Sequence, residues 1–93
     1  MARSFEWDPE RAKSNLQTQK VSFQEAETVF DDPYHATVFD SEHSGSEDRW
    51  VTIGLSKQNR LIRVSHTDRG EVIRIIGARE PTGRETEAYE EGE

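Results

Sequence analysis

Arginines give residues 60–79 most of the chemistry that this chain can offer. The stretch reads RLIRVSHTDRGEVIRIIGAR and holds five of the chain's twelve basic residues. Two runs rich in Ile and Val around a glycine predict a β-hairpin, with Arg69 and Gly70 as its two-residue loop and Asp68 opposite Glu71. In that register Ser65 lies opposite Arg74, and one sheet face carries Arg63, Ser65 and Arg74. Such a face is either an anion site or an ordinary solvated surface.

The other face of the predicted hairpin is apolar and includes one histidine. The same register groups His66 with four aliphatic residues: Ile62, Val64, Ile73 and Ile75. His66 is therefore either a buried hydrogen-bonding residue or an acid–base group beside the turn.

Arg79 defines a second candidate site at the opposite end of the hairpin. The spacing of Thr82 and Glu85 is that of a capping box and predicts a helix over residues 83–91. This helix would bring Arg84, Glu85 and Tyr89 close to Arg79, which either takes part in catalysis or only forms an ion pair with Glu85. His66 and Arg79 are on the order of 20 Å apart along the hairpin, too far to act on one reacting atom.

Other catalytic motifs have no counterpart in the sequence. There is no cysteine, no Gly-rich phosphate loop and no Cys/His cluster. His43 lies in the acidic loop 40–48, but a loop without fixed ligand spacing is weak evidence for a metal site. We expect no metal and no cofactor, so any catalysis would depend on the arginines and on His66, Glu85 and Tyr89.

Net charge is unevenly distributed along the chain. The total is −7 over 93 residues, which argues against non-specific binding of nucleic acid. Residues 57–79, however, carry six basic and two acidic residues, whereas residues 80–93 carry one and six. The basic middle of the chain is therefore either a local anion site or a basic surface that the acidic tail neutralises.

The elements predicted around these residues indicate a single α+β domain over residues 1–93. Asp8 and Ser22 have the positions of helix caps, and Pro33 ends the second helix. The predicted order is β-α-α-β-β-β-β-α: two N-terminal helices and a C-terminal helix around an antiparallel four-stranded sheet, with the helices packed on one sheet face. The elements lie at residues 5–7, 9–19, 23–30, 35–39 and 49–56, then two strands within 60–79 and a helix at 83–91. No apolar run is long enough to span a membrane, and the first ten residues lack the apolar core of a signal peptide, so we expect a cytoplasmic protein.

The chain resembles the BrnT family of small ribonuclease toxins. The resemblance rests on four strings: FEWDPERAKSN at 5–15, VSFQEAETVFDDP at 21–33, RWVTIGLS at 49–56 and VIRIIGAREPTGRETEAYEE at 72–91. It implies a fold similar to the RelE-type microbial ribonucleases, and cleavage of RNA without a metal. It also implies a type II toxin–antitoxin role: growth arrest on release, and neutralisation by a ribbon-helix-helix antitoxin, BrnA, in a hetero-oligomer. Operator DNA would be contacted only through the antitoxin.

Functional candidates carry over by position from the family pattern. The catalytic candidates are Arg74, Arg79, His66, Glu85 and Tyr89. Arg49 also matches the pattern, and we expect it to contact RNA with Arg63, Ser65 and Arg84. Our hypothesis is that RNA lies across the sheet face of Arg63 and Arg74, with the chemistry at the Arg79 end.

One departure from the family supports an alternative function. After Asn15 the family usually shows Lys-His-Gly, but this chain has Thr18, Gln19 and Lys20 there. If the missing pair binds or protonates RNA, the chain is a weak or inactive relative. It would then act as a module that binds the antitoxin.

Overall fold

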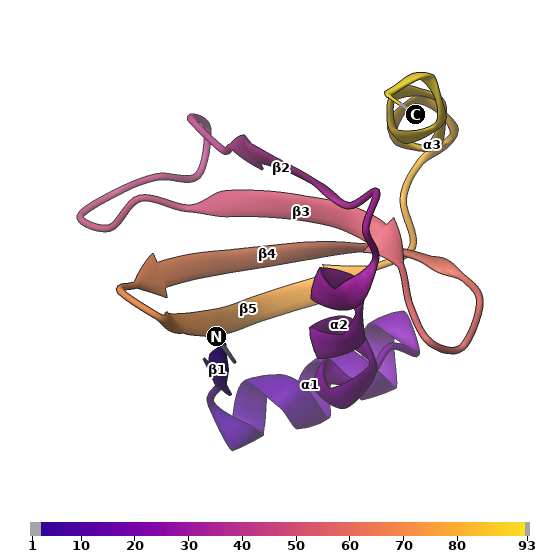
Figure 1. Ribbon diagram of the computed structural model, residues 1–93. Coiled ribbons are helices and arrows are strands. Elements are labelled where there is room, and N and C mark those ends of the chain that lie inside the picture. Colours follow the sequence, from indigo (N-terminus) through magenta and orange to yellow (C-terminus); the bar gives the residue numbers. More distant parts are fainter. Residues whose placement is uncertain (1–2, 93) are drawn as a thin grey trace.

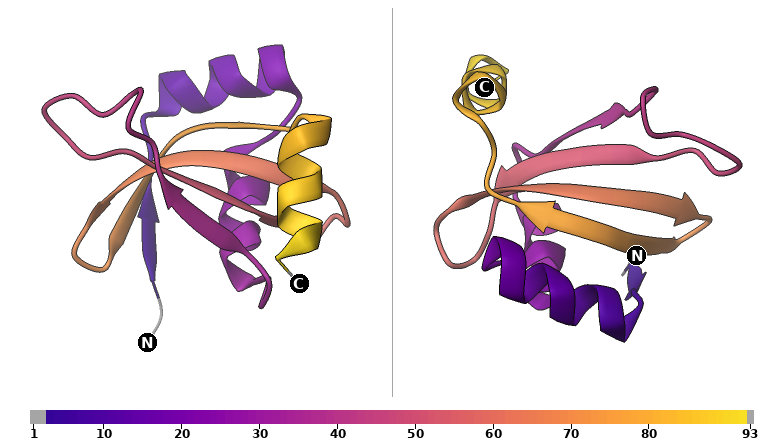
Figure 2. Two further views of the ribbon diagram at one scale, coloured as in Figure 1. Left: turned by 90° about the horizontal axis from the view of Figure 1, so that it is seen from above. Right: turned by 180° about the vertical axis from the view of Figure 1, so that it is seen from behind.

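The computed structural model describes residues 3–92, and its elements follow the predicted order. They are β1 (Ser4–Glu6), α1 (Pro9–Gln19), α2 (Phe23–Thr28), the 3-10 helix η1 (Val29–Asp31), β2 (Ala36–Phe39), β3 (Trp50–Leu55), β4 (Leu61–Arg69), β5 (Val72–Arg79) and α3 (Gly83–Glu91). The helices α1 and α2 lie together near β1 and β5, whereas α3 lies apart from them at the opposite corner (Figures 1 and 2). Among the described residues, no helix has the length and apolar character needed to cross a bilayer.

Local capping explains where the three α-helices begin. The side chain of Asp8 accepts a hydrogen bond from the Glu10 amide, and that of Ser22 accepts one from the Glu25 amide. Thr82 and Glu85 form a complete capping box at the start of α3. These side chains satisfy amides that have no partner inside the helix, so the predicted helix starts are confirmed.

The sheet has five strands rather than the predicted four. Its order is β1-β5-β4-β3-β2, and β1 runs parallel to β5, which makes the sheet mixed. The three residues of β1 are too few to reveal their partner from sequence. Four strands are antiparallel as expected, but the prediction of a purely antiparallel four-stranded sheet is wrong.

The hairpin turn lies one residue later than predicted. Arg69 pairs with Val72, so the loop is Gly70 and Glu71. Gly70 has a φ of 64°, and no other residue of the loop has a positive φ. In a two-residue turn that needs a positive φ only at its first position, glycine is favoured at that position. Gly70 is therefore the first residue of the loop, and Arg69 is the last residue of β4. Arg74 consequently pairs with Thr67 rather than with Ser65, and Ser65, which lies beyond an irregularity in the pairing, pairs with Gly77.

A bulge in β5 changes which side chains share a face. The pairing of β4 with β5 shifts between Ser65 and His66, so Arg63 lies directly opposite Arg79. Strict alternation from Arg74 would place Arg79 on the opposite, buried face. The extra residue of the bulge returns Arg79 to the face of Arg74 and leaves Ala78 buried at 4% exposure.

The core lies between α2, η1 and one face of the sheet. The buried apolar residues come from the helical segment and from the hairpin: Val21, Phe23, Ala26, Val29, Phe30, Ile62, Val64, Ile73, Ile75 and Ala78. The predicted buried face of the hairpin, including His66, is confirmed. The prediction that all helices cover one face is wrong, because α3 contacts Arg63 and Arg79 on the other.

Candidate active site

Two arginines and one carboxylate meet where α3 approaches the sheet. Arg79 donates to both oxygens of Glu85, with Nη1–Oε1 at 3.0 Å and Nη2–Oε2 at 3.3 Å. Arg63 Nε lies 3.0 Å from Glu85 Oε2, an ion pair without hydrogen-bond geometry. Because Arg63 and Arg79 are direct cross-strand partners, Glu85 lies between two like charges that would otherwise repel.

Glu85 is held in its charged form. Burial raises its pKa, but hydrogen bonds from Arg79 and the Thr82 amide, with the charge of Arg63, outweigh burial and lower the pKa below its usual value. The carboxylate is therefore ionised at neutral pH and can accept a proton as a weak base, and the guanidinium groups beside it can stabilise negative charge.

The sheet face that carries these residues is rich in arginine. We call it the arginine face and define it by Arg49, Arg63, Arg74 and Arg79. Thr67, the partner of Arg74, and Ser65, which accepts from Arg63 Nη1 at 3.2 Å, lie on it too. Arg74 is paired with Glu6 at 3.0 Å, and Glu47 is paired with the neighbouring Arg69 at 2.7 Å. A bound phosphate would therefore compete with carboxylates for these cations.

A cleft of about 180 Å³ opens beside Arg79, where β5 continues beyond its pairing with β1. Asn15 of α1 closes this edge: its side chain accepts from the Ala78 amide and donates to the Ala78 carbonyl at 2.9 Å. Gln19, one turn further along α1, lines the cleft together with Arg63 and Arg79. Sequence reasoning did not find Asn15 as a site residue, and it singled out position 19 only through the histidine that the family usually has there. The place of both side chains depends on how α1 packs against β5.

Tyr89 and Arg84 lie on α3 with different surroundings. The Tyr89 hydroxyl donates to Asp32 Oδ2 at 2.6 Å and thereby ties α3 to the segment after η1. Arg84 is exposed. The expected closeness of α3 to Arg79 is confirmed through Glu85, and the predicted Arg79–Glu85 ion pair is present.

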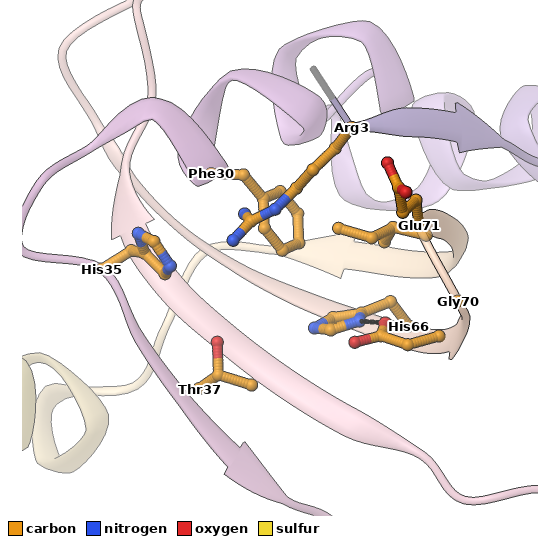
Figure 3. Close-up of a pocket in the computed structure, with 9 residues that line it drawn as sticks. Arg3, Phe30, His35, Thr37, His66, Gly70 and Glu71 are labelled. Carbon is orange, nitrogen blue, oxygen red and sulfur yellow. Dashed lines mark hydrogen bonds and ion pairs between the residues drawn. The ribbon is translucent and has the colours of Figure 1, made fainter. Parts of the chain in front are cut away.

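His66 lies on the other face of the sheet, in a chain of four hydrogen-bonded side chains. Its Nδ1 is 2.7 Å from Asp68 Oδ1, its Nε2 is 2.7 Å from Thr52 Oγ1, and Thr52 is 2.7 Å from Thr37. The ring is only 1% exposed and packs edge-on against Phe30. A pocket of about 530 Å³ lies above it, with Arg3 over Phe30 and His35 at one end (Figure 3).

The surroundings of His66 favour a neutral ring. Burial lowers its pKa, and the charges of Arg3 and His35 act in the same direction, while Asp68 opposes them. A carboxylate can only accept, so Nδ1 carries the proton and Nε2 accepts from Thr52. Both ring nitrogens are thus occupied, and His66 and Arg79 face opposite sides of the sheet. The structure does not bring these two candidates together.

One acidic group on the described part of the chain has the composition of a metal site. Ligand atoms of Asp40, Glu42 and His43 all lie within 4.8 Å of one another. His43 Nδ1 is already 2.9 Å from Asp40 Oδ2, and Glu42 and His43 are exposed. This arrangement is common on protein surfaces without a metal.

Comparisons with known proteins found a similar fold and a matching family. A search of curated protein sequences found no match. The crystal structure of the Brucella abortus ribonuclease toxin BrnT is similar in fold, with a TM-score of 0.63, 15% identity, and coverage of 87% of this chain and 99% of that one. Residues 7–85 match the family described as ribonuclease toxin, BrnT, of type II toxin–antitoxin systems. The chain therefore belongs to the BrnT family of ribonuclease toxins of type II toxin–antitoxin systems.

Proposed function

We propose that this chain is a metal-independent endoribonuclease whose active site is the cluster of Arg63, Arg79 and Glu85. The observation that carries the proposal is the ionised Glu85 carboxylate between two guanidinium groups on the arginine face. A phosphate drawn to the two arginines would have a proton acceptor within reach. The cluster thus combines two requirements of RNA cleavage, a proton acceptor and groups that stabilise charge on the phosphate.

The proposed reaction is attack of the RNA 2′-hydroxyl on the adjacent phosphorus. Glu85 accepts the hydroxyl proton while Arg63 and Arg79 stabilise the charge that develops on the non-bridging oxygens. The O2′–P bond forms, the P–O5′ bond breaks, and the leaving oxygen takes its proton from water. Arg49 and Arg74 bind neighbouring phosphates, with Ser65 and Arg84 as further RNA contacts, and Tyr89 holds α3 in place through Asp32. In this scheme His66 supports the fold and does not act on the same phosphate.

Induced expression and RNA digestion of purified variants test the proposal. We expect Arg79→Ala to lower cleavage about 100-fold, as loss of a charge-stabilising donor does elsewhere, and Arg74→Ala to lower it less. Arg79→Lys keeps the charge but not the two-pronged geometry, so it should be impaired too. The control is Arg11→Ala, which changes an exposed arginine of α1. Equal growth arrest by wild type, Arg74→Ala and Arg79→Ala would refute these roles.

A second candidate function is binding of the antitoxin without RNA cleavage. The family usually has Lys-His where this chain has Thr18 and Gln19, and Gln19 lines the cleft with Arg63 and Arg79. A histidine there could protonate the leaving oxygen, which glutamine cannot. Gln19→His should therefore raise cleavage if the chain is a weakened enzyme. No cleavage by either protein, together with antitoxin binding, would select the second function.

The remaining family properties are part of the same proposal. The partner is a BrnA-like ribbon-helix-helix antitoxin, which forms a hetero-oligomer with this chain in the cytoplasm and carries the contact to operator DNA. The likeness to RelE-type ribonucleases is likewise proposed. A short neighbouring gene for a ribbon-helix-helix protein would support this context, and its absence would contradict it.

A further inference from the structure

The third helix has no buried residue. Every residue of α3 is exposed or half-buried, and the helix is nine residues long. Isolated helices of this length are marginal in water, so packing must usually support them. Contacts that hold α3 include those of Glu85 with the paired arginines and of Tyr89 with Asp32.

A groove of about 360 Å³ lies between α3 and the sheet. Its sheet side is apolar and formed by Ala36, Val38, Val51 and Ile53, while Ala88 and Tyr89 line it from α3. Val38 is 60% exposed and Phe39, at the end of the same strand, is 47% exposed. Since β2 is the edge strand of the sheet, this apolar surface is open on the side where a further segment can lie along it.

The segments that border the groove are acidic. Asp40 lines its end and begins the loop 40–48, which contains four acidic and no basic residues. On the other side, residues 80–93 contain six acidic residues and one arginine. A second copy of this chain would bring acidic segments against acidic segments, which is unfavourable. A partner with apolar side chains flanked by Lys or Arg complements both the groove and its borders.

We propose that this groove is the docking site of an amphipathic, basic segment of the antitoxin. The segment lies along β2 and packs its apolar side chains against Val38 and Ala88. The proposal rests on the toxin–antitoxin role given above, and it adds a consequence. Arg63 and Glu85 border the groove, so the docked segment would cover two members of the proposed active site and exclude RNA.

Binding of the purified antitoxin encoded beside this chain tests the proposal by calorimetry. Val38→Asp should weaken the affinity at least about 30-fold, since it places a charge at the centre of the apolar contact. Ala88→Arg, at an exposed position on α3, should have a similar effect. The control is Leu16→Asp, which changes a 50% exposed apolar residue of α1, far from the groove, and should bind as wild type. Binding should weaken with rising salt.

The outcomes separate this proposal from the proposed enzyme activity. Co-expression of the antitoxin should rescue growth from wild type and Leu16→Asp but not from Val38→Asp. If no variant cleaves RNA, the active-site proposal fails while the binding measurement still reports on the groove. Equal affinity of wild type, Val38→Asp and Ala88→Arg would overturn the docking site. Sedimentation of the chain as a dimer that Val38→Asp dissociates would assign the groove to a second copy and also overturn it.

Discussion

Arg63 and Arg79 lie directly opposite each other on β4 and β5, and their guanidinium groups reach the same carboxylate. Like charges at directly paired positions destabilise a sheet. Glu85 offsets this repulsion from outside the sheet, so the start of α3 and the cationic pair depend on each other. Removing the charge of Glu85 should therefore weaken the contact between α3 and the sheet and lower the cleavage of RNA.

Glu85→Gln separates the charge of this residue from its capping role. Glutamine also suits the third position of a capping box, so α3 should still begin at Gly83. We expect RNA cleavage to fall at least about 100-fold through loss of the proton acceptor. Stability should fall by about 1 kcal/mol or less, because the ion pairs are partly exposed. The matched control is Glu87→Gln, an exposed residue of the same helix, and unchanged cleavage by Glu85→Gln would remove Glu85 from the mechanism.

His66 should make the protein less stable in mild acid. Its folded pKa lies below the ordinary value of 6.5 because of burial, so the unfolded chain binds a proton more readily. Stability is then fully present above about pH 6.5 and is lost as the pH falls through that value towards the folded pKa. Urea unfolding at pH 7.5 and at pH 5.5 measures the difference.

His66→Gln is the control for that pH dependence. The variant should be less stable at pH 7.5 by about 1–3 kcal/mol, because hydrogen bonds to Asp68 and Thr52 are disturbed. The difference in its free energy of unfolding between pH 7.5 and pH 5.5 should also be much smaller than that of the wild type. An identical pH dependence in wild type and variant would mean that another group is responsible.

A nearly buried ion pair fixes the turn between β3 and β4 to α2. Arg60 donates to both oxygens of Glu25, with Nη2–Oε1 at 2.6 Å and Nε–Oε2 at 2.8 Å, and the Glu25 side chain is 2% exposed. Arg60→Ala should destabilise the fold by about 3 kcal/mol, because it leaves a buried carboxylate without its partner. Lys57→Ala breaks an exposed pair with Asp31 and should change stability by less than about 0.5 kcal/mol.

The same pair predicts a second loss of stability at lower pH. The hydrogen bond from Arg60 lowers the pKa of Glu25, against the effect of burial. This contribution is present above the ordinary pKa of 4.5 and is lost as the pH falls through the lowered value. Thermal unfolding between pH 5 and pH 3 should show it in wild type, whereas a change of the same size in Arg60→Ala would contradict the assignment.

Gly54 is required where β3 passes under η1. A Cβ at this position would lie 2.9 Å from Val29 Cγ1 and 3.0 Å from His35 Cβ. Gly54→Ala should therefore destabilise the fold by about 1–3 kcal/mol through overpacking. Gly45→Ala is the matched control, since a Cβ there meets nothing within 4 Å. Similar denaturation midpoints for both variants would contradict this prediction, because the core would then accommodate the added methyl group with little loss of stability.

Local patterns were sufficient for the elements and for the core. Asp8, Ser22 and Thr82 could be recognised as caps because a cap contacts amides only two or three residues away. The buried face of the hairpin followed from the alternation of side chains along each strand. Moving the turn by one residue changes each cross-strand partner by two residues, so each side chain of the predicted buried face stays on that face.

The sequence by itself determined the family, the order of helices and strands, and the concentration of arginine in residues 60–79. Only the tertiary structure decided which of these arginines act together. The bulge in β5 placed Arg79 opposite Arg63, the docking of α1 placed Gln19 in their cleft, and α3 supplied Glu85 from the other side. These relationships join residues far apart in sequence, and the pairing of Arg63 with Arg79 also depends on a single unpaired residue in a strand, so no local pattern reports them.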